Sequence, residues 1–473
     1  MFDVAVIGAG CIGAMVAREL SRYELDVVVL EKGADVCSGA SRANSGIVHA
    51  GFDAAPGTLK AKYNVAGNRM MYAVCDELGV DYRRNGSLVA AFGAEEMQIL
   101  DALLKRGQEN GVEGLRILSR EELIEREPNI KRNAQGALYA PTGGIVCPFE
   151  LTIAAMGNAM DNGVALYTDF AVEAAENGDA VVLTASDGRR VEAKYAINCA
   201  GSGAEAIARL FGDESFRIGA RKGEYILLDS SSEGFVKSTI FAVPTAAGKG
   251  VLITPTADGN ILIGPTSVEE QTFSTAIRRG AFEEIEKKAD RLCENIPYGK
   301  TITSFAGVRA YSDRHDFILE ESKAGNLFHA AGIESPGLTS SPAIGKRIAE
   351  MTAKRFGAAK RKNFNPYRKP FSYFRKLAAE QKNGIIGKDP EYGQIVCRCE
   401  SVTLGEIRRA MTENPPARTV DGIKLRTRAG MGRCQGGFCQ PSVLEAIARE
   451  YGIGLGEVTK NGKGSEIVTG GEI

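Results

Sequence analysis

Four cysteines near the end of the chain have the spacing of a metal centre. Cys397 and Cys399 form a CxC pair, and Cys434 and Cys439 form a CxxxxC pair. Two close pairs of thiolates can surround one soft-metal centre, which suits either a 2Fe–2S cluster or a structural zinc ion. The other cysteines are scattered along a long chain, which argues against a disulfide framework and for a reducing compartment.

A glycine-rich turn near the N-terminus predicts a dinucleotide-binding site. A buried apolar run leads into a GxGxxG turn made by Gly8, Gly10 and Gly13, and a helix-like segment follows. The next apolar run ends at Glu31 and Lys32. In such a unit the glycines allow a tight turn, close approach of a pyrophosphate and close helix packing, while the acidic residue accepts hydrogen bonds from ribose hydroxyls. The glycines alone do not distinguish FAD from NAD.

Composition indicates an ordinary globular protein of several packed units. Of 473 residues, 44% are hydrophobic and 25% are charged, and the formal net charge is −1. This balance provides no general electrostatic field for nucleic acid or an anionic membrane, and we expect no nucleic-acid partner. Neither a signal peptide nor an apolar stretch long enough for a transmembrane segment is recognisable, so we expect a cytoplasmic protein that reaches a membrane only peripherally, through a partner.

Strand and helix patterns predict an α/β fold with interleaved domains. We expect a Rossmann-type dinucleotide-binding domain, an antiparallel-sheet substrate domain and a small helical C-terminal iron–sulfur domain. The expected dinucleotide-binding segments, assigned to FAD below, are 1–75, 142–216 and 300–356, and the substrate segments are 76–141 and 217–299. A basic linker at 357–392, the cysteine domain at 393–455 and a glycine-rich tail at 456–473 complete the chain.

The segment after the glycine turn favours FAD. It contains Ser41, Asn44, Ser45 and His49 in the pattern SxxNSGxxHxG. Together with the glycine unit, this pattern resembles the D-amino-acid-oxidase-type flavoprotein superfamily, above all its glycerol-3-phosphate dehydrogenase and L-2-hydroxyglutarate oxidase branches. The resemblance implies that the serine–asparagine loop lies along FAD and that His49 sits near the flavin ring as a catalytic residue; a hydrogen-bonded histidine in a surface loop is the other interpretation.

The same resemblance extends over most of the chain. It implies a catalytic Arg309 in a GVR segment facing the flavin, where a guanidinium can clamp a carboxylate or phosphate, although an ordinary salt bridge is the alternative. Lys249, between two glycines, is a weaker candidate for substrate contact, and His329, within an apolar run, is interpreted as a core residue. The further residues implied to contact the cofactor are Val172, Gly201, Gly332, Gly337, Leu338 and Thr339.

The C-terminal module VCRCE…TRAGMGRCQGGFC resembles the bacterioferritin-associated-ferredoxin (BFD) type of 2Fe–2S domain, which is found at the C-terminal end of anaerobic glycerol-3-phosphate dehydrogenases. We expect a capping box at Thr403–Glu406 to begin one helix and Pro441 to open another. Arg398, Arg426, Arg428 and Arg433 would offset the negative charge of a cluster held by four thiolates.

Taken together, these features predict an FAD-dependent dehydrogenase with a 2Fe–2S cluster. The expected reaction oxidises sn-glycerol 3-phosphate, a small anionic substrate, to dihydroxyacetone phosphate and passes electrons through the cluster to a partner protein such as a flavoprotein reductase or a quinone-linked protein. An L-2-hydroxy acid, such as 2-hydroxyglutarate, or an imino or amino acid is the alternative substrate. An electron-carrier or redox-sensing subunit is the alternative class of function.

Overall fold

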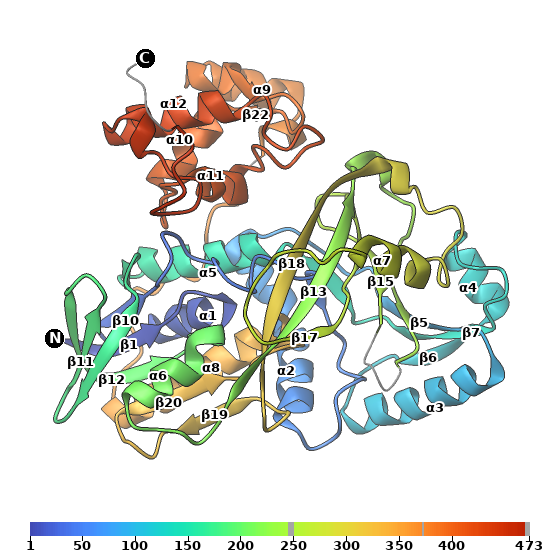
Figure 1. Cartoon of the computed structure of the whole chain (residues 1–473), viewed down its shortest axis with the longest axis horizontal. Coiled ribbons are helices and arrows are strands. Elements are labelled where there is room, and N and C mark those ends of the chain that lie inside the picture. Colours follow the sequence, from blue (N-terminus) through green and yellow to red (C-terminus); the bar gives the residue numbers. More distant parts are fainter. Residues whose placement is uncertain (245–249, 371–372, 469–473) are drawn as a thin grey trace.

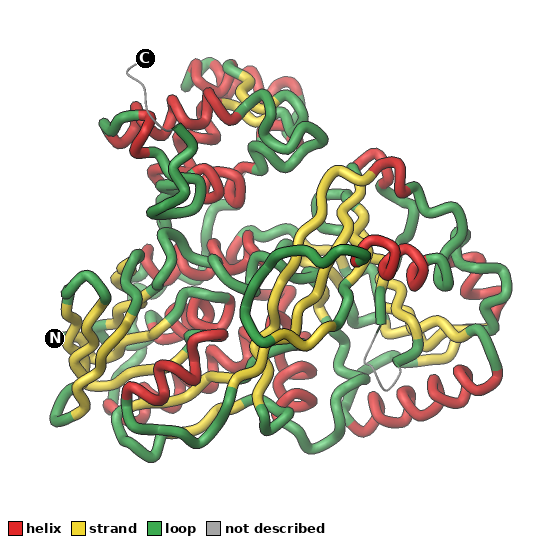
Figure 2. The backbone as a smooth tube through the Cα atoms, viewed as in Figure 1, coloured by secondary structure: helices red, strands yellow, loops and turns green. Residues whose placement is uncertain are grey.

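The computed structural model describes residues 1–244, 250–370 and 373–468. Two sheets with their helices form the main body, and a C-terminal unit, residues 373–468, lies against one side of that body (Figures 1 and 2). No helix within the described ranges is long and apolar enough to cross a membrane.

The first sheet is built around parallel strands. Across it lie β10, β11, β12, β1, β2 and β9, with β20 beside β12 and β19 beside β20. Every residue of β2 and β20 is buried, as expected for parallel strands covered on both faces. The pairing of β12 with β1 is parallel, so β12 returns the chain to the dinucleotide-binding unit. The strand bounds are β1 Phe2–Ile7, β2 Val27–Leu30, β9 Ala165–Tyr167, β10 Val172–Asn177, β11 Val181–Ala185, β12 Arg190–Asn198, β19 Ile318–Glu321 and β20 Leu327–Ala331.

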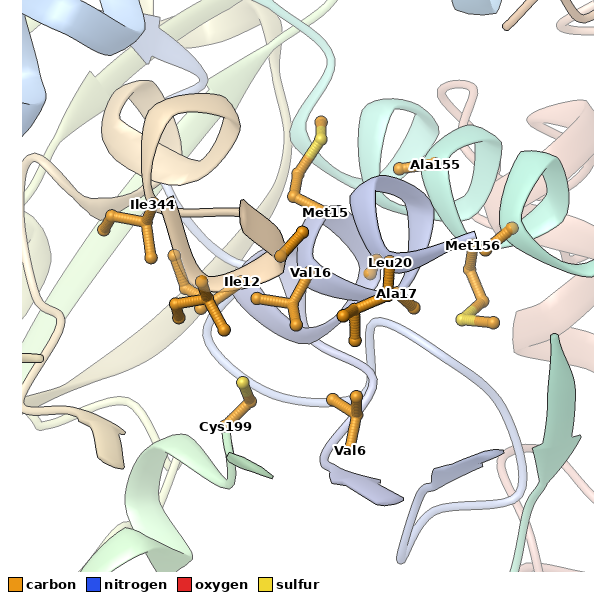
Figure 3. Close-up of a cluster of buried hydrophobic side chains, with 14 of the residues drawn as sticks. Val6, Ile12, Met15, Val16, Ala17, Leu20, Ala155, Met156, Cys199 and Ile344 are labelled. Atoms are coloured by element: carbon orange, nitrogen blue, oxygen red, sulfur yellow. The ribbon is translucent and has the colours of Figure 1, made fainter. Parts of the chain in front are cut away.

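One face of this sheet carries the largest apolar core. Helix α1 (Cys11–Leu20) packs between α5 (Pro148–Asp161) and α8 (Gly337–Phe356) through Met15, Met156 and Ile344 (Figure 3). Helix α2 (Leu59–Leu78) joins the same cluster, whereas α6 (Ala204–Leu210) covers the opposite face. Gly345 allows the close approach of α8 to α1, because a Cβ there would meet the Met15 backbone at 2.8 Å.

The second sheet forms the other half of the body. Its order is β17, β13, β16, β15, β14, β5, β7 and β6, with β18 paired along β13, and all described pairings are antiparallel except that of β14 with β5. Helices α3 (Ala94–Glu109), α4 (Arg120–Arg126) and α7 (Ala281–Ala289) accompany it. The strand bounds are β5 Ser87–Ala91, β6 Arg116–Ser119, β7 Gly136–Ala140, β13 Ile218–Leu228, β14 Thr239–Ala242, β15 Leu252–Pro255, β16 Ile261–Gly264, β17 Val268–Glu270 and β18 Thr301–Ser312. A small sheet of β3 (Ile47–Val48), β8 (Gly144–Val146) and β4 (Tyr82–Arg83) lies apart from both.

The C-terminal unit is helical. It contains α9 (Ala379–Ile386), α10 (Leu404–Thr412), α11 (Val420–Thr427) and α12 (Gln440–Tyr451), with a short hairpin of β21 (Ile395–Cys397) and β22 (Val402–Thr403). The predicted capping box is present, because the Thr403 side chain accepts from the Glu406 amide while the Glu406 carboxylate accepts from the Thr403 amide. Its core is separate from the cores of the two sheets.

Two expected boundaries differ from the architecture. Strand β18, expected to open an FAD-binding segment at 300, pairs along the length of β13 and so belongs to the second sheet. The basic linker expected at 357–392 divides in two: residues near Arg361 lie against the turn between α1 and β2, where the Arg361 amide donates to the Arg22 carbonyl. Tyr373 and Phe374 are buried in the C-terminal unit, with the Phe374 amide bound to Glu406.

Candidate active site and metal centre

A cavity of about 1570 Å³ is lined by both sheets and by the C-terminal unit. It begins at the glycine turn after β1, passes the loop 38–46 and reaches the strands β13 and β18. This volume exceeds the ~300–1,000 Å³ of an ordinary small-molecule site, which leaves room for a large cofactor together with a substrate.

The glycine turn is shaped by close backbone contacts. Gly8 has φ +104°, and a Cβ there would lie 2.6 Å from the Cys199 carbonyl oxygen. A Cβ on Gly13 would overlap the Gly8 carbonyl oxygen, so this glycine lets α1 start directly against β1. Gly10 is the N-cap of α1 and lines the cavity. The turn thus leaves the helix N-terminus open to a phosphate.

Glu31 lies at the end of β2 beside this turn. Its carboxylate accepts hydrogen bonds from the Ala9 amide (2.8 Å), the Gly33 amide (2.8 Å) and the Ser38 hydroxyl (2.9 Å). These donors fix a buried acceptor at the cavity wall, and a carboxylate retains lone pairs for a ribose hydroxyl. Lys32, Val172 and Gly201 line the same part of the cavity.

The loop 38–46 is ordered by its own polar side chains. The Ser41 hydroxyl accepts from the Cys11 amide at 2.9 Å, which ties the loop to the start of α1. The Asn44 side chain donates to the Ser41 carbonyl (2.9 Å) and accepts from the Gly46 amide (2.9 Å). Ser41, Asn44 and Ser45 all line the cavity.

The turn 332–339 also contributes to the cavity wall. Gly337, the first residue of α8, and Leu338 line the cavity. Gly332 and Thr339 are not among the cavity-lining residues and support the turn from behind. Gly332 has φ +61°, and the Thr339 hydroxyl donates to the Ile47 carbonyl (3.1 Å) while accepting from the His49 amide (2.9 Å).

His49 follows β3 and is half-buried at the cavity wall. Its Nε2 lies 3.5 Å from the Ser335 hydroxyl, and its ring is 6.0 Å from that of Phe241. Asn68 donates to its carbonyl oxygen at 3.1 Å. The backbone is therefore held at both its amide and its carbonyl, and the imidazole is directed by a hydroxyl from the turn before α8.

Arg309 lies on β18, directly across the ladder from Arg221 on β13. The two arginines differ in their partners. Arg221 is bound to Glu334 (3.3 Å) and Glu269 (3.2 Å), whereas Arg309 donates to the Thr266 carbonyl at 3.3 Å and has no carboxylate partner in the described ranges. Arg309 is therefore the cation of this pair that remains open to a bound anion.

Several cavity residues were missed by sequence reasoning. Tyr225 stacks on Phe305 at 4.8 Å and its hydroxyl accepts from Ser45 at 3.4 Å; burial raises the pKa of this tyrosine. Lys60, from α2, is bound to Glu334 at 2.8 Å. Nothing close in sequence marks these two residues, because their partners Phe305 and Glu334 lie far away along the chain. Lys249 lies outside the described residues.

His329 has the core role expected of it. It is fully buried, with Nε2 3.2 Å from Asp213 and Nδ1 3.3 Å from the Asn198 amide nitrogen. Burial lowers the pKa of His329, against the opposing effect of Asp213.

The four predicted metal ligands line one hollow in the C-terminal unit. They fall into two pairs: Cys399 and Cys434 have sulfurs 3.6 Å apart, and a hydrogen bond from Cys439 lowers the pKa of Cys397 to about 6. Two pairs of thiolates in one hollow suit a binuclear cluster, in which each iron takes two sulfurs.

Two of the four arginines expected beside the cluster are also bound to the main body. Arg426 is bound to Asp35 in the loop after β2, and Arg428 to Asp258 in the second sheet's turn between β15 and β16. Both carboxylates belong to the main body, so these arginines serve the contact between the C-terminal unit and that body. Arg398 lines the cysteine hollow, and Arg433 is exposed and 3.4 Å from Asp229.

The residues present fit FAD and a 2Fe–2S cluster. A glycine turn that a Cβ would fill, a fixed buried carboxylate and an arginine open to an anion define a dinucleotide-dependent oxidoreductase with a joined sulfur-ligated centre. Residues 3–351 match the family model for FAD dependent oxidoreductases, and residues 395–449 match that for BFD-like [2Fe-2S] binding domains. The chain belongs to the FAD dependent oxidoreductase family, and its cofactors are FAD and a 2Fe–2S cluster.

Named relatives agree with this assignment. The chain is similar to a glycerol 3-phosphate dehydrogenase of Caloramator mitchellensis, with 46% identity over 99% of this chain and 98% of the relative. It is 30% identical to a mitochondrial L-2-hydroxyglutarate dehydrogenase of Pongo abelii over 75% of this chain and 88% of that one. The FAD-bound structure of the L-α-glycerophosphate oxidase of Mycoplasma pneumoniae superposes with a TM-score of 0.74 and 29% identity, covering 78% of this chain and 98% of the oxidase.

Proposed function

We propose that this protein oxidises sn-glycerol 3-phosphate to dihydroxyacetone phosphate and delivers the electrons to a partner protein. The 46% identity to a glycerol 3-phosphate dehydrogenase over nearly the whole length of both chains supports the substrate. The observation that carries the proposal is Arg309, a cavity cation with no carboxylate partner in the described ranges. When bound, FAD supplies a two-electron acceptor and the 2Fe–2S cluster a one-electron carrier.

Each candidate residue has a stated task in this proposal. Gly8, Gly10 and Gly13 would hold the pyrophosphate at the start of α1, and Glu31 would bind the adenosine ribose. Arg309 would bind the substrate phosphate through two parallel N–H groups. The residues proposed to hold the rest of the cofactor are Lys32, Ser41, Asn44, Ser45, Val172, Gly201, Gly332, Gly337, Leu338 and Thr339; Cys397, Cys399, Cys434 and Cys439 would bind the cluster.

His49 is the proposed general base. Its Nε2 would accept the proton of the secondary hydroxyl as that carbon is oxidised, because neutral imidazole is the side-chain base best matched to neutral pH. Ser335, 3.5 Å from this nitrogen, would orient the ring before the substrate arrives. Burial of the surrounding strands would keep bulk water from the reacting carbon.

The cysteine hollow is the proposed exit for electrons. Cys399 is exposed, Phe438 between two of the cysteines is 86% exposed, and Ile395 beside the CxC pair is 45% exposed. Arg398 and Arg449 line the same hollow. An apolar contact with two arginines beside it fits an acceptor protein with an acidic rim around its own redox centre.

An anaerobic substrate panel tests the reaction. Glycerol 3-phosphate should bleach the bound flavin within seconds, while L-2-hydroxyglutarate, L-proline and glycine should leave its spectrum unchanged. Bleaching by the hydroxy acid in place of glycerol 3-phosphate would refute the substrate. No bleaching by any of them would favour an electron-carrier function.

A second experiment tests the exit. Phe438→Ser should slow electron delivery to the physiological acceptor about tenfold, because a central exposed aromatic residue commonly carries much of the binding energy of an interface. Flavin bleaching by the substrate should be unaffected. Equal rates of electron delivery in Phe438→Ser and the unaltered protein would show that the acceptor does not bind at Phe438.

A further inference from the structure

The C-terminal unit forms part of the wall of the flavin cavity. The C-terminal unit contributes Lys424 and Leu425 of α11, Met431 of the following loop, and Gln435 between the second pair of cysteines to the same cavity as the glycine turn and the loop 38–46. Figure 1 shows α11 on the side of the unit that faces the main body. An electron-transfer module attached only by its linker would not need to complete this wall.

A buried ion pair holds this unit to the loop after β2 of the first sheet. The Arg426 guanidinium donates through both terminal nitrogens to the two oxygens of Asp35, at 2.7 and 2.8 Å. The side chains are only 4% and 15% exposed. Helix α11 also approaches this loop closely, because a Cβ on Gly422 would lie 2.8 Å from the Asp35 carboxylate.

A second buried network holds the unit to the second sheet. Arg428 donates to Asp258 (2.8 Å) and Asn260 (3.2 Å) in the turn between β15 and β16, and to Glu400 (2.8 Å) beside Cys399. Arg375 bridges the same two carboxylates, Asp258 at 2.9 Å and Glu400 at 2.7 Å.

The backbone at Arg428 is unusual as well. This residue is the C-cap of α11 and has φ +69°, a left-handed conformation that favours glycine. An arginine kept there, with its guanidinium buried among three partners from two units, indicates that its position serves a purpose beyond ending a helix.

Paired buried charges of this kind specify a position more than they add stability. Two fully paired arginines resist removal from their partners, since separation would leave buried charges uncompensated. Asp35 lies in the loop that follows β2 of the first sheet, and Asp258 lies in a turn of the second sheet and lines the cavity, so the two contacts bind the unit to both sheets.

We propose that the iron–sulfur unit has a second function: latched by Arg426–Asp35 and Arg428–Asp258, it closes the flavin cavity to solvent and molecular oxygen. The reaction it suppresses is the two-electron reduction of O₂ by the reduced cofactor, in which O₂ takes up two electrons and two protons and leaves as H₂O₂. Electrons that cannot leave this way must leave through the cluster. This second function depends on the proposed function in one respect: the flavin must be reduced during turnover.

The test opens the latches from the side of the main body, leaving the cysteine domain unaltered. Asp35→Asn, Asp258→Asn and the double variant are compared with Arg408→Met, which removes an ion pair internal to the C-terminal unit. Arg426→Met opens the first latch from the other side, in case an Asn variant fails to fold. Hydrogen exchange of α11 reports whether the unit has been released.

Two measurements that need no substrate report on the cavity. In the double variant, iodide should quench the fluorescence of bound flavin at least about threefold more strongly, and light-reduced flavin should be reoxidised by O₂ at least about tenfold faster. Arg408→Met should match the unaltered protein in both. Because the flavin is reduced by light, these results stand whether or not glycerol 3-phosphate is the substrate.

Two results would overturn the proposal. One is an α11 that stays as protected from hydrogen exchange in the double variant as in the unaltered protein, since the pairs would then not be latches. The other is a released α11 with unchanged iodide quenching and unchanged reoxidation by O₂, since the unit would then not close the cavity.

Discussion

Replacing Arg309 with methionine tests the anion site most directly. The guanidinium lies in the cavity wall with only the Thr266 carbonyl, 3.3 Å away, as a described partner, so little structural bonding is lost with it. Methionine keeps much of the apolar stem that packs on β18 and removes the charge. The effect should therefore fall on substrate binding and turnover and spare the fold.

The size of the effect follows from the contacts that would be lost. A charge-assisted hydrogen bond contributes about 1.5–3 kcal/mol, and a two-pronged contact in a half-buried wall should cost about 3 kcal/mol in the transition state. That corresponds to a loss of about 100-fold in kcat/KM. Arg309→Lys should recover part of it, because lysine keeps the charge and loses the fork.

Arg221→Met is the matched control. This arginine stands directly opposite Arg309 on β13, but its charge is already neutralised by Glu334 and Glu269. Its removal should change kcat/KM by less than about threefold, since Glu334 keeps Lys60 as a partner. Steady-state kinetics with an artificial acceptor measure both variants. Losses of equal size in the two variants would refute a specific anion site at Arg309.

Three further changes have expected outcomes. Gly13→Ala should yield colourless protein without FAD, because the added Cβ overlaps the Gly8 carbonyl oxygen. Gly93→Ala, outside the cavity lining and with open space around its Cβ, should retain the cofactor, and flavin absorbance of the purified proteins decides. Cys399→Ser should abolish the visible absorbance of the cluster and the inorganic sulfide content while flavin bleaching continues, and loss of both signals together would contradict separate centres. Burial, with the negative charges of Asp258 and Asp81, raises the pKa of Glu150 from 4.5 to about 8. The folded protein therefore binds the Glu150 proton more tightly than the unfolded chain does. The stability gained from this proton is complete below pH 4.5 and is lost as the pH rises to 8. The melting temperature should fall between about pH 6 and pH 8 more in the unaltered protein than in Glu150→Gln, and equal falls would count against this assignment.

Local patterns were enough to predict the N-terminal unit and the cysteine domain. The glycine turn and the Thr403–Glu406 capping box depend on residues close in sequence, and their geometry has the expected form. Strand β18 was assigned to the wrong side of a boundary because its partner β13 lies far away in the chain. An apolar alternation shows that a strand is present but not which sheet receives it.

The same limit applies to charged residues. Arg426 and Arg428 were assigned to the cluster because they adjoin its cysteines in sequence, yet their carboxylate partners in the main body are Asp35 and Asp258. The sequence does not show which carboxylate an arginine binds. Contacts between separate units depend on how the folded domains pack against each other. The roles of His49 and Arg309 remain predictions that the proposed variants test.

The chain crosses between the two sheets more than once, and this limits how the substrate specificity of such an enzyme can evolve. Strand β13 enters the second sheet after α6 of the first, and β18 returns the chain to β19. A gene exchange that imported another substrate-binding half would have to cut at several points, so new specificity must arise by single replacements along these strands. The C-terminal unit follows a single connection, residues 357–372, and one recombination event is enough to add or remove it.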